Sequence, residues 1–475
     1  MTPRVKHTVR RTLVVLGAGV LVQRLCQLLG FVLIGHALGV VGLGVFAQGQ
    51  ALAAVLTVFA GAGVRSLTAR TLAGSPGSAR AILLAAVRRR LWTGSLWILG
   101  VGAVACTRSA QPWFWVLCLL QVLPAACDMK QLLDASGRTR REVRIETATA
   151  ILQVLGIGGW LLGGGDRLDV LAGIALACRC LYAIGAIGTI LALPASGPSP
   201  VVVPRDLGVA TAHTVHELLT IGDIWVVAVT LGDAAAGFYA VGVRFAAAAL
   251  MPSAQLARLL LPHLLHAGAD GDAAKTLATA LRSTLLITLP MLTGGMAAAT
   301  ALSELSGAAF VAAAPSLRLL LLAGCLQHLG WQCSHALLAL HRDRLYAHSL
   351  GWPALLQFAN LAVLPALLPP APALAATLAA AGSVLAHGVY ALLGLGVTRA
   401  LWRPRTDLWR NPVLLAIATG IAAWLPTLFV AGATVLPLQL LAGGSAFVLA
   451  LWRLELRGRW SRLGDGLATA SGFGA

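Results

Sequence analysis

Residues 13–38 read LVVLGAGVLVQRLCQLLGFVLIGHAL, and after the six residues GVVGLG the chain continues at 45–68 as VFAQGQALAAVLTVFAGAGVRSLT. Each stretch is longer than the roughly 20 residues that an apolar helix needs to cross a bilayer. Both are almost free of charge, because Arg24 lies inside the first and Arg65 near the end of the second. The pair therefore predicts two membrane-spanning helices joined by a short glycine-rich turn.

The rest of the chain has the same character. Of the 475 residues, 58% are hydrophobic and 11% are charged, and the mean hydropathy is +0.83. Soluble domains carry about 25% charged residues, so this composition excludes an ordinary soluble enzyme. The apolar stretches show no period of two residues, which favours helices over a β-barrel. We predict an all-α polytopic membrane protein with about fourteen transmembrane helices, at 13–38, 45–68, 81–105, 113–133, 145–163, 169–193, 207–231, 238–264, 276–301, 312–339, 345–367, 373–395, 412–432 and 436–452.

Basic residues are distributed unevenly about these helices. With the N-terminus in the cytoplasm, 28 of the 35 Lys and Arg residues lie on the inner side, two lie in outer loops and five lie within helices. Cytoplasmic loops of membrane proteins carry such an excess. We therefore interpret the net charge of +18 as a topology signal and not as a sign of nucleic-acid binding. Both termini are expected to face the cytoplasm.

Neither the cysteines nor the N-terminal segment changes this interpretation. Seven of the eight cysteines lie in apolar stretches, where they behave as small hydrophobic residues. The pair Cys178 and Cys180 has no second pair at a spacing typical of metal sites, so we expect neither a disulfide framework nor a bound metal. Residues 1–11 are basic, and the apolar run after them lacks a clear cleavage site, so we expect a retained first helix.

A short motif occurs twice, 193 residues apart. Leu38-Gly39-x4-Gly44-x-Phe46-Ala47 recurs as Leu231-Gly232-x4-Gly237-x-Tyr239-Ala240. Each copy follows the first helix of a predicted group of six, and an even number of spans separates them. Such repeats are typical of transporters, in which the substrate site lies between the repeats. We predict a six-helix bundle at 1–193, a second at 207–395 and two additional transmembrane helices at 412–452.

The residues around the two motifs resemble Wzx-type polysaccharide flippases. The resemblance rests on Arg24, Ala37 to Phe46, Gly61-x-Gly63 and Arg70 in the first half, and on Glu217, Asp223, Leu231-Gly232, Gly237-x-Tyr239, Arg244 and Pro262 in the second. In the turn, Val40-Val41 stands where an acidic residue or a proline is common in that family. The resemblance implies membership of the MOP superfamily, which also contains MurJ-type flippases and MATE exporters. It also implies a bacterial cytoplasmic (inner) membrane location.

Charged residues inside the helices are the candidate functional residues. An Arg or Asp at a helix centre costs about 2.5–3.5 kcal/mol on insertion scales, so such residues usually face an inner cavity or a partner. Arg24 either binds an anion in a central cavity or pairs with a charge on another helix. Glu217 is its equivalent in the second half, so an Arg24–Glu217 ion pair is one hypothesis. Glu217 also belongs to a polar stripe with His213, His216 and Thr220, and Asp223 lies deeper.

Further candidates lie in the second half. Arg244 and Arg258 are fourteen residues apart, close to four helical turns, and therefore share a face. Arg318 begins another helix, in which Gln327 lies beside a stripe of His328, Gln332 and His335. This stripe has metal-like spacing but no nearby carboxylate, so no metal is expected. The substrate-site prediction comprises Arg24, Glu217, Asp223, Arg244, Arg258, Arg318, Gln327 and His328. For Asp128, Arg179, Gln357, Asn360 and His387, packing is the simpler explanation.

The intramembrane charges favour an anionic substrate. Five Arg residues lie within the helices against three acidic residues, and a cationic cavity attracts anions. Arg binds phosphate through two parallel hydrogen bonds. We therefore predict a flippase for a lipid-(pyro)phosphate-linked oligosaccharide, acting without covalent chemistry or a cofactor and in contact with membrane lipids and polysaccharide polymerase machinery. Coupling to H+ or Na+ is left open. The alternatives are a MATE-like cation-coupled exporter, a MurJ-type lipid II flippase and a membrane enzyme; the last usually needs a large outer loop.

Overall fold

The computed structural model describes residues 3–61, 79–108, 111–128, 139–194, 211, 214–215, 218, 221–270, 273–340, 342–367, 371–399, 406–428, 430 and 433–451. These residues form helices and turns, without a strand among them. Eight of their helical stretches are long and apolar enough to cross a membrane, and two shorter apolar helices accompany them. The prediction of an all-α polytopic membrane protein is therefore confirmed. The count of fourteen spans stays a prediction.

Helix α1 (Pro3–Gly61) contains the first two predicted spans. Its apolar part, Ala18–Gly61, has 44 residues. At about 1.5 Å per residue it would be roughly twice as long as the hydrocarbon core is thick. The helix is interrupted at Gly39, where φ is 65° and ψ is −168°. The expected link at 39–44 is thus wrong in extent: a single residue makes the turn, because glycine alone adopts this conformation without strain.

The same interruption recurs in the second copy of the motif. Helix α10 (Asp223–Leu231) ends at Gly232, which has φ 87° and ψ 168°, and α11 (Asp233–Asp270) begins directly after it. Gly39 and Gly232 therefore share one left-handed, extended conformation at the 193-residue offset that the sequence shows. The repeat is confirmed as a repeat of local structure.

The chain divides into two compact units. The N-terminal unit, Arg11–Gly237, contains most of α1 together with α3 (Ala79–Arg108), α4 (Pro112–Leu120), α5 (Val122–Ala126), α7 (Thr139–Leu162), α8 (Leu168–Leu191) and α10. The C-terminal unit consists of Phe238–Ala475 with Met1–Arg10. The two units do not test the predicted domain boundaries, because they are defined by internal contacts alone. Three parts therefore stay predictions: the bundles at 1–193 and 207–395 and the additional pair of helices at 412–452.

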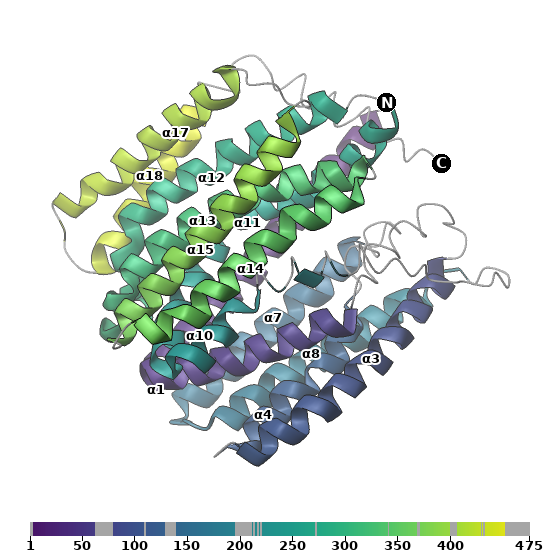
Figure 1. Cartoon of the computed structure of the whole chain (residues 1–475), viewed down its shortest axis with the longest axis vertical. Coiled ribbons are helices and arrows are strands. Elements are labelled where there is room, and N and C mark those ends of the chain that lie inside the picture. The colour runs from purple at the N-terminus through teal and green to yellow at the C-terminus, as the bar shows by residue number, and fades with distance from the viewer. Residues whose placement is uncertain are drawn as a thin grey trace. The chain divides into compact units, whose positions relative to one another are not determined.

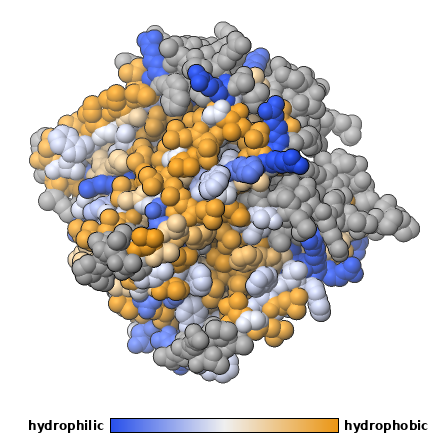
Figure 2. Space-filling model, in the orientation of Figure 1, coloured by the Kyte–Doolittle hydropathy of each residue, from blue (hydrophilic) through white to orange (hydrophobic). Residues whose placement is uncertain are grey.

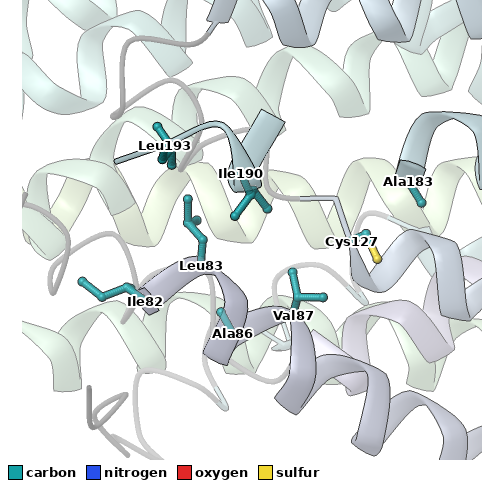
Figure 3. Packing of buried hydrophobic residues seen from close by; sticks show 8 residues of the cluster. All are labelled: Ile82, Leu83, Ala86, Val87, Cys127, Ala183, Ile190 and Leu193. Carbon is teal, nitrogen blue, oxygen red and sulfur yellow. The ribbon is translucent and has the colours of Figure 1, made fainter. Parts of the chain in front are cut away.

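In the N-terminal unit, the fourth predicted span is broken in two. The span was expected at 113–133, but α4 ends at Leu120 and α5 ends at Ala126. Pro124 has no N–H group to donate to the carbonyl of Leu120, so the helical hydrogen bonding is interrupted just before it. Behind this break, residues of α3 and α8 pack against Cys127 in an apolar core (Figure 3), which comprises Ile82, Leu83, Ala86, Val87, Cys127, Ala183, Ile190 and Leu193.

A buried arginine closes the end of this broken helix. Arg90 on α3 is 1% exposed and donates from Nη1 to the carbonyl of Asp128 at 2.7 Å and from Nη2 to that of Ala125 at 3.2 Å. These carbonyls lie where α5 ends, and that of Ala125 also accepts from the backbone N–H of Asp128 at 3.1 Å. The guanidinium therefore ties α3 to the end of α5.

Replacing Arg90 with leucine should destabilise the fold without touching an exposed charge. The change removes the Arg90 donor from the carbonyl of Asp128 and one of two donors from that of Ala125, and a buried polar group left unsatisfied costs about 1–3 kcal/mol. We expect a loss of several degrees in the thermal midpoint of the detergent-solubilised chain, followed by size-exclusion chromatography after heating. Arg88, which is exposed on the same helix, supplies the control, and Arg88→Leu should keep the midpoint of the wild type. Equal midpoints for the two variants would show that the Arg90 contacts contribute nothing.

The C-terminal unit consists of α11 and of α12 (Ala273–Glu304), α13 (Ala314–Ala339), α14 (Asp343–Leu367), α15 (Pro372–Val397), α17 (Thr406–Trp424) and α18 (Leu436–Leu451). The longest helix contact joins α13 and α15, which lie side by side (Figure 1), while α12 packs against α13 and α17. Small residues allow the last of these contacts. A Cβ on Gly420 would lie 2.9 Å from Thr293, whose hydroxyl donates to the carbonyl of Ala416 at 2.8 Å.

Large apolar side chains also cover much of the outside of these helices. On α17 and α18 they include Leu414, Ile417, Ile421, Leu440, Leu441, Val448 and Leu449, all of which are exposed. Figure 2 shows apolar residues over much of the described surface on the face in view. A soluble monomer rarely exposes such contiguous apolar area. The surface is that of a multi-pass membrane protein in contact with lipid.

Candidate functional site

Arg24 lies in the first apolar span of α1 and is exposed on its unit. Its Nη1 donates to Oε1 of Gln27 at 2.9 Å, one helical turn away, and the guanidinium interacts electrostatically with Glu146 on α7. Gln27 is exposed as well. Contact of this charge with lipid would cost about 2.5–3.5 kcal/mol, so the face that carries Arg24 and Gln27 must meet water or a polar partner.

A polar contact behind Arg24 holds its helix in place. Gln23 is 3% exposed, and its Nε2 donates to the carbonyl of Val143 at 3.3 Å and to Oγ1 of Thr147 at 3.1 Å. A Cβ on Gly19 would lie 2.3 Å from Cγ1 of Val143, so α1 and α7 approach closely only because residue 19 is glycine. Since Gln23 precedes Arg24 directly, this contact determines the direction in which the arginine points.

Carboxylates form a deeper layer of the same unit. The hydroxyl of Tyr182 on α8 lies 3.4 Å from Oδ1 of Asp128 and 3.4 Å from Oε1 of Glu142, and Glu142 is 1% exposed. Arg179, one turn before Tyr182, interacts electrostatically with Asp128. The structure thus brings Asp128 and Arg179 together, although the sequence suggested only packing roles for them. Of these carboxylates, Glu142 is buried and Asp128 is half-buried.

Sequence reasoning missed Glu142, Glu146 and Tyr182. Glu142 was assigned to a loop, because the predicted span began at 145, whereas α7 begins at Thr139. Glu142 and Glu146 are four residues apart and so lie on one face of that helix. That spacing was the available signal, and it was hidden by the misplaced start of the helix.

Asp223 is buried, with 6% of its surface exposed, and is the first residue of α10. Its Oδ1 accepts a hydrogen bond from the backbone N–H of Ile224 at 2.8 Å. A carboxylate at the first turn of a helix is stabilised by the free N–H groups there. This contact gives Asp223 a structural role in the described residues. Glu217, with His213, His216 and Thr220, lies outside them, so the Arg24–Glu217 pair stays a hypothesis.

The two copies of the repeated turn meet inside the N-terminal unit. A Cβ on Gly44 would lie 1.8 Å from the carbonyl oxygen of Asp233, and one on Gly237 would lie 2.1 Å from that of Val40. The two contacts are equivalent under the 193-residue offset, so they form a reciprocal pair. The valine that departs from the family pattern at position 40 contributes its carbonyl group to this contact, and its Cγ1 would lie 3.2 Å from the same Cβ.

In the C-terminal unit, two arginines are exposed within apolar helices. Arg318 on α13 donates from Nε to the carbonyl of Met296 at 3.4 Å and from Nη2 to Oγ1 of Thr300 at 3.2 Å, both on α12. Arg244 on α11 is also exposed. The side chain of Arg258 lies outside the described part of the chain, so its predicted common face with Arg244 stays untested.

The two predicted neighbours Gln327 and His328 differ in their exposure. Gln327 is half-buried, while His328 is 6% exposed and its ring centre lies 5.5 Å from that of Trp331. His328 interacts electrostatically with His387 on α15, a residue that the sequence assigned to packing. In the part of the chain that is described, no three His, Cys, Asp or Glu side chains are grouped so that they could hold a metal ion.

Three arginines are exposed within the described apolar helices, namely Arg24, Arg244 and Arg318. Exposure does not divide the charges strictly by sign: Glu142, Asp223 and Arg90 are buried, and Asp128, Glu146 and Arg179 are half-buried. A membrane protein exposes charge within the hydrocarbon region only where water or a polar ligand reaches it. Such faces would present positive charge to whatever enters there.

No family model matches this sequence, and no curated protein matches it. Among solved structures, the chain is similar to the lipid II flippase MurJ in an inward closed conformation, with a TM-score of 0.66 and 13% identity over 94% of this chain and 100% of that one. It is also similar to a MOP superfamily transporter from Pyrococcus furiosus (TM-score 0.61, 15% identity, 83% and 95% of the two chains). A third similar structure is MATE in complex with MaL6, with a TM-score of 0.60 and 15% identity over 82% of this chain and 96% of that one. The chain has the fold of MOP-superfamily transporters.

Proposed function

We propose that this chain is a flippase that moves a lipid-(pyro)phosphate-linked oligosaccharide from the cytoplasmic to the outer leaflet of a bacterial inner membrane by alternating access. The observation that carries the proposal is the exposure of three arginines, Arg24, Arg244 and Arg318, within apolar helices. A pyrophosphate matches exposed guanidinium groups, because each can donate two parallel hydrogen bonds to it.

Two features of the substrate follow from this arrangement. The headgroup is charged and hydrated, so it must travel along faces that carry the arginines. The lipid tail is apolar and remains in the bilayer, which the leucine-rich outer surface of the helices already contacts. The fold supports transport without covalent chemistry, since the solved proteins that share it are named as flippases and transporters. The proposal has both termini in the cytoplasm.

The proposal is tested by reconstituting the full chain in proteoliposomes with a fluorescent polyprenyl-pyrophosphate oligosaccharide. Movement between leaflets is followed by the loss of fluorescence to a membrane-impermeant quencher. We expect movement well above that in protein-free liposomes. A neutral lipid carrying the same sugar without the pyrophosphate is the matched control and should move slowly, because it offers no anion to the arginines.

A MATE-like exporter would behave differently in the same vesicles. It would transport a cationic dye, which exposed arginines repel. Movement of the dye together with failure of the pyrophosphate lipid would contradict the proposed function. Equal movement of the charged and the neutral lipid would contradict the role of the exposed arginines. Lipid II is added as a third substrate, because its pyrophosphate satisfies the same charge requirement. Movement of lipid II in place of the oligosaccharide lipid would indicate a MurJ-type activity.

A further inference from the structure

Two buried imidazole rings lie together in the C-terminal unit. His328 is near the middle of α13 and His387 is near the middle of α15, and each is 6% exposed. The two helices are in contact at this level, since a Cβ on Gly388 would lie 3.9 Å from Cδ1 of Leu326. The rings interact electrostatically across the contact. They therefore occupy one site in the interior of the membrane-spanning region.

Each ring has a buried nitrogen without a hydrogen-bond partner among the described atoms. Nδ1 of His387 lies 2.8 Å from the carbonyl oxygen of Ser383. A carbonyl only accepts, so Nδ1 carries the hydrogen and Nε2 retains its lone pair. Among the described atoms, neither Nε2 of His387 nor Nδ1 of His328 has a hydrogen-bond partner. Buried polar atoms are normally satisfied, so this pair is open to a small polar ligand.

The described charged and titratable groups on the helices around the rings include two carboxylates, both at helix ends. The groups are Arg318, Cys325, Cys333 and His335 on α13, Tyr390 on α15, Lys275, Arg282 and Glu304 on α12, Arg344, Tyr346 and His348 on α14, and Asp233, Tyr239 and Arg244 on α11. Glu304 is the last residue of α12, and Asp233 is the first residue of α11 and belongs to the N-terminal unit. Within the described part of the chain, the titratable group that acts electrostatically on His328 is the ring of His387.

We propose that His328 and His387 form a proton-binding site that takes up a single proton, at Nε2 of His387 or Nδ1 of His328. Imidazole is the side chain whose ordinary titration falls between about pH 5 and 8. Two neighbouring imidazolium ions repel each other, so the second proton is strongly disfavoured. The proton enters from the outer aqueous phase and leaves to the cytoplasm. This coupling step rests on the proposed function, whereas proton binding does not.

The site is connected to the helices that surround it. The hydroxyl of Ser383 lies 2.8 Å from that of Tyr239 on α11 and accepts from Nε2 of Gln357 on α14 at 2.7 Å. The carbonyl of the same residue accepts from His387. A positive charge on the ring strengthens that hydrogen bond, because a charged donor bonds more tightly. Occupation of the site thus acts on a residue that joins α11, α14 and α15.

Nitrogen NMR of the full chain, labelled with 15N-histidine in lipid nanodiscs, tests proton binding directly. H328Q and H387Q assign the two signals, and His348, which is exposed on α14, provides an ordinary histidine for comparison. On acidification, we expect one ring of the pair to become doubly protonated while the other remains neutral. Two rings that stay neutral down to pH 5, or that both protonate together with His348, would overturn the proposal.

The coupling step is tested in the proteoliposome assay with an imposed pH gradient. With one proton per cycle, the leaflet distribution of the pyrophosphate lipid in the wild type should change about tenfold for each pH unit of gradient. H387Q should still equilibrate the lipid but show no dependence on the gradient, and H348Q should behave like the wild type. A gradient response that survives in H387Q would exclude coupling through this pair. If the wild type moves no lipid, the proposed function fails, and the NMR titration alone decides the proton site.

Discussion

Replacement of Arg24 with alanine is expected to reduce the initial rate of lipid movement by about 10- to 100-fold, since hydrogen bonds to charged groups contribute about 1.5–3 kcal/mol. Arg24 is exposed within an apolar helix, and its direction is set by the contact of Gln23 with Val143 and Thr147. Its removal takes away the charge without disturbing that contact. The measurement is the quenching assay with the polyprenyl-pyrophosphate oligosaccharide.

Two further variants separate the charge of Arg24 from its shape. Arg24→Lys keeps the charge but loses the planar fork, so an intermediate rate is expected. Arg144→Ala removes an exposed arginine near the start of α7 and should transport like the wild type. A wild-type rate in Arg24→Ala, with the protein eluting as a folded monodisperse species, would remove Arg24 from the substrate path.

Alanine at Gly44 or at Gly237 is expected to prevent the two copies of the repeated turn from meeting and to reduce transport by more than about tenfold. The new methyl groups would lie 1.8 Å from the carbonyl oxygen of Asp233 and 2.1 Å from that of Val40. Both obstacles are backbone atoms, so no side-chain rotation relieves the overlap. In an alternating-access cycle the outer and the inner end of the transport pathway close one after the other. The predicted topology places the two copies of the repeated turn at the outer end.

The separation of the turns can be measured with spin labels at Val41 and Ala234, equivalent positions in the two copies, in a variant lacking the native cysteines. A longer label distance is expected in Gly44→Ala and in Gly237→Ala. The control is Gly159→Ala in α7, where a Cβ meets nothing within 4 Å. This change should leave distance and transport unaltered and the helix slightly more stable. An unchanged label distance in both turn variants would mean that the backbone yields at little cost.

Much of the helical architecture could be predicted from the sequence. Hydrocarbon offers no partner to backbone N–H and C=O groups, so long apolar stretches have to be helical there. The errors occurred where one residue decided the geometry. Gly39 makes alone the turn for which six residues were expected, and Pro124 breaks a span that composition showed as continuous.

The candidate site could be predicted only in part. Arg24 and Arg318 could be named as candidates because a charge within an apolar stretch is visible in the sequence alone. The repeat was found because both copies need glycine at an otherwise forbidden backbone conformation. The roles of Asp223 and His387 were not predictable in this way, since they depend on which atoms surround each side chain after the helices pack.

The sequence by itself determined that the chain crosses a membrane through helices and that its predicted intramembrane charge is mainly basic. The tertiary structure decided which polar groups meet. Gln23 donates a hydrogen bond to Thr147, which is 124 residues away in the sequence, and His328 interacts electrostatically with His387 on another helix. The physical reason is that insertion into lipid is a property of each helix alone, whereas pairing requires a particular contact between two helices.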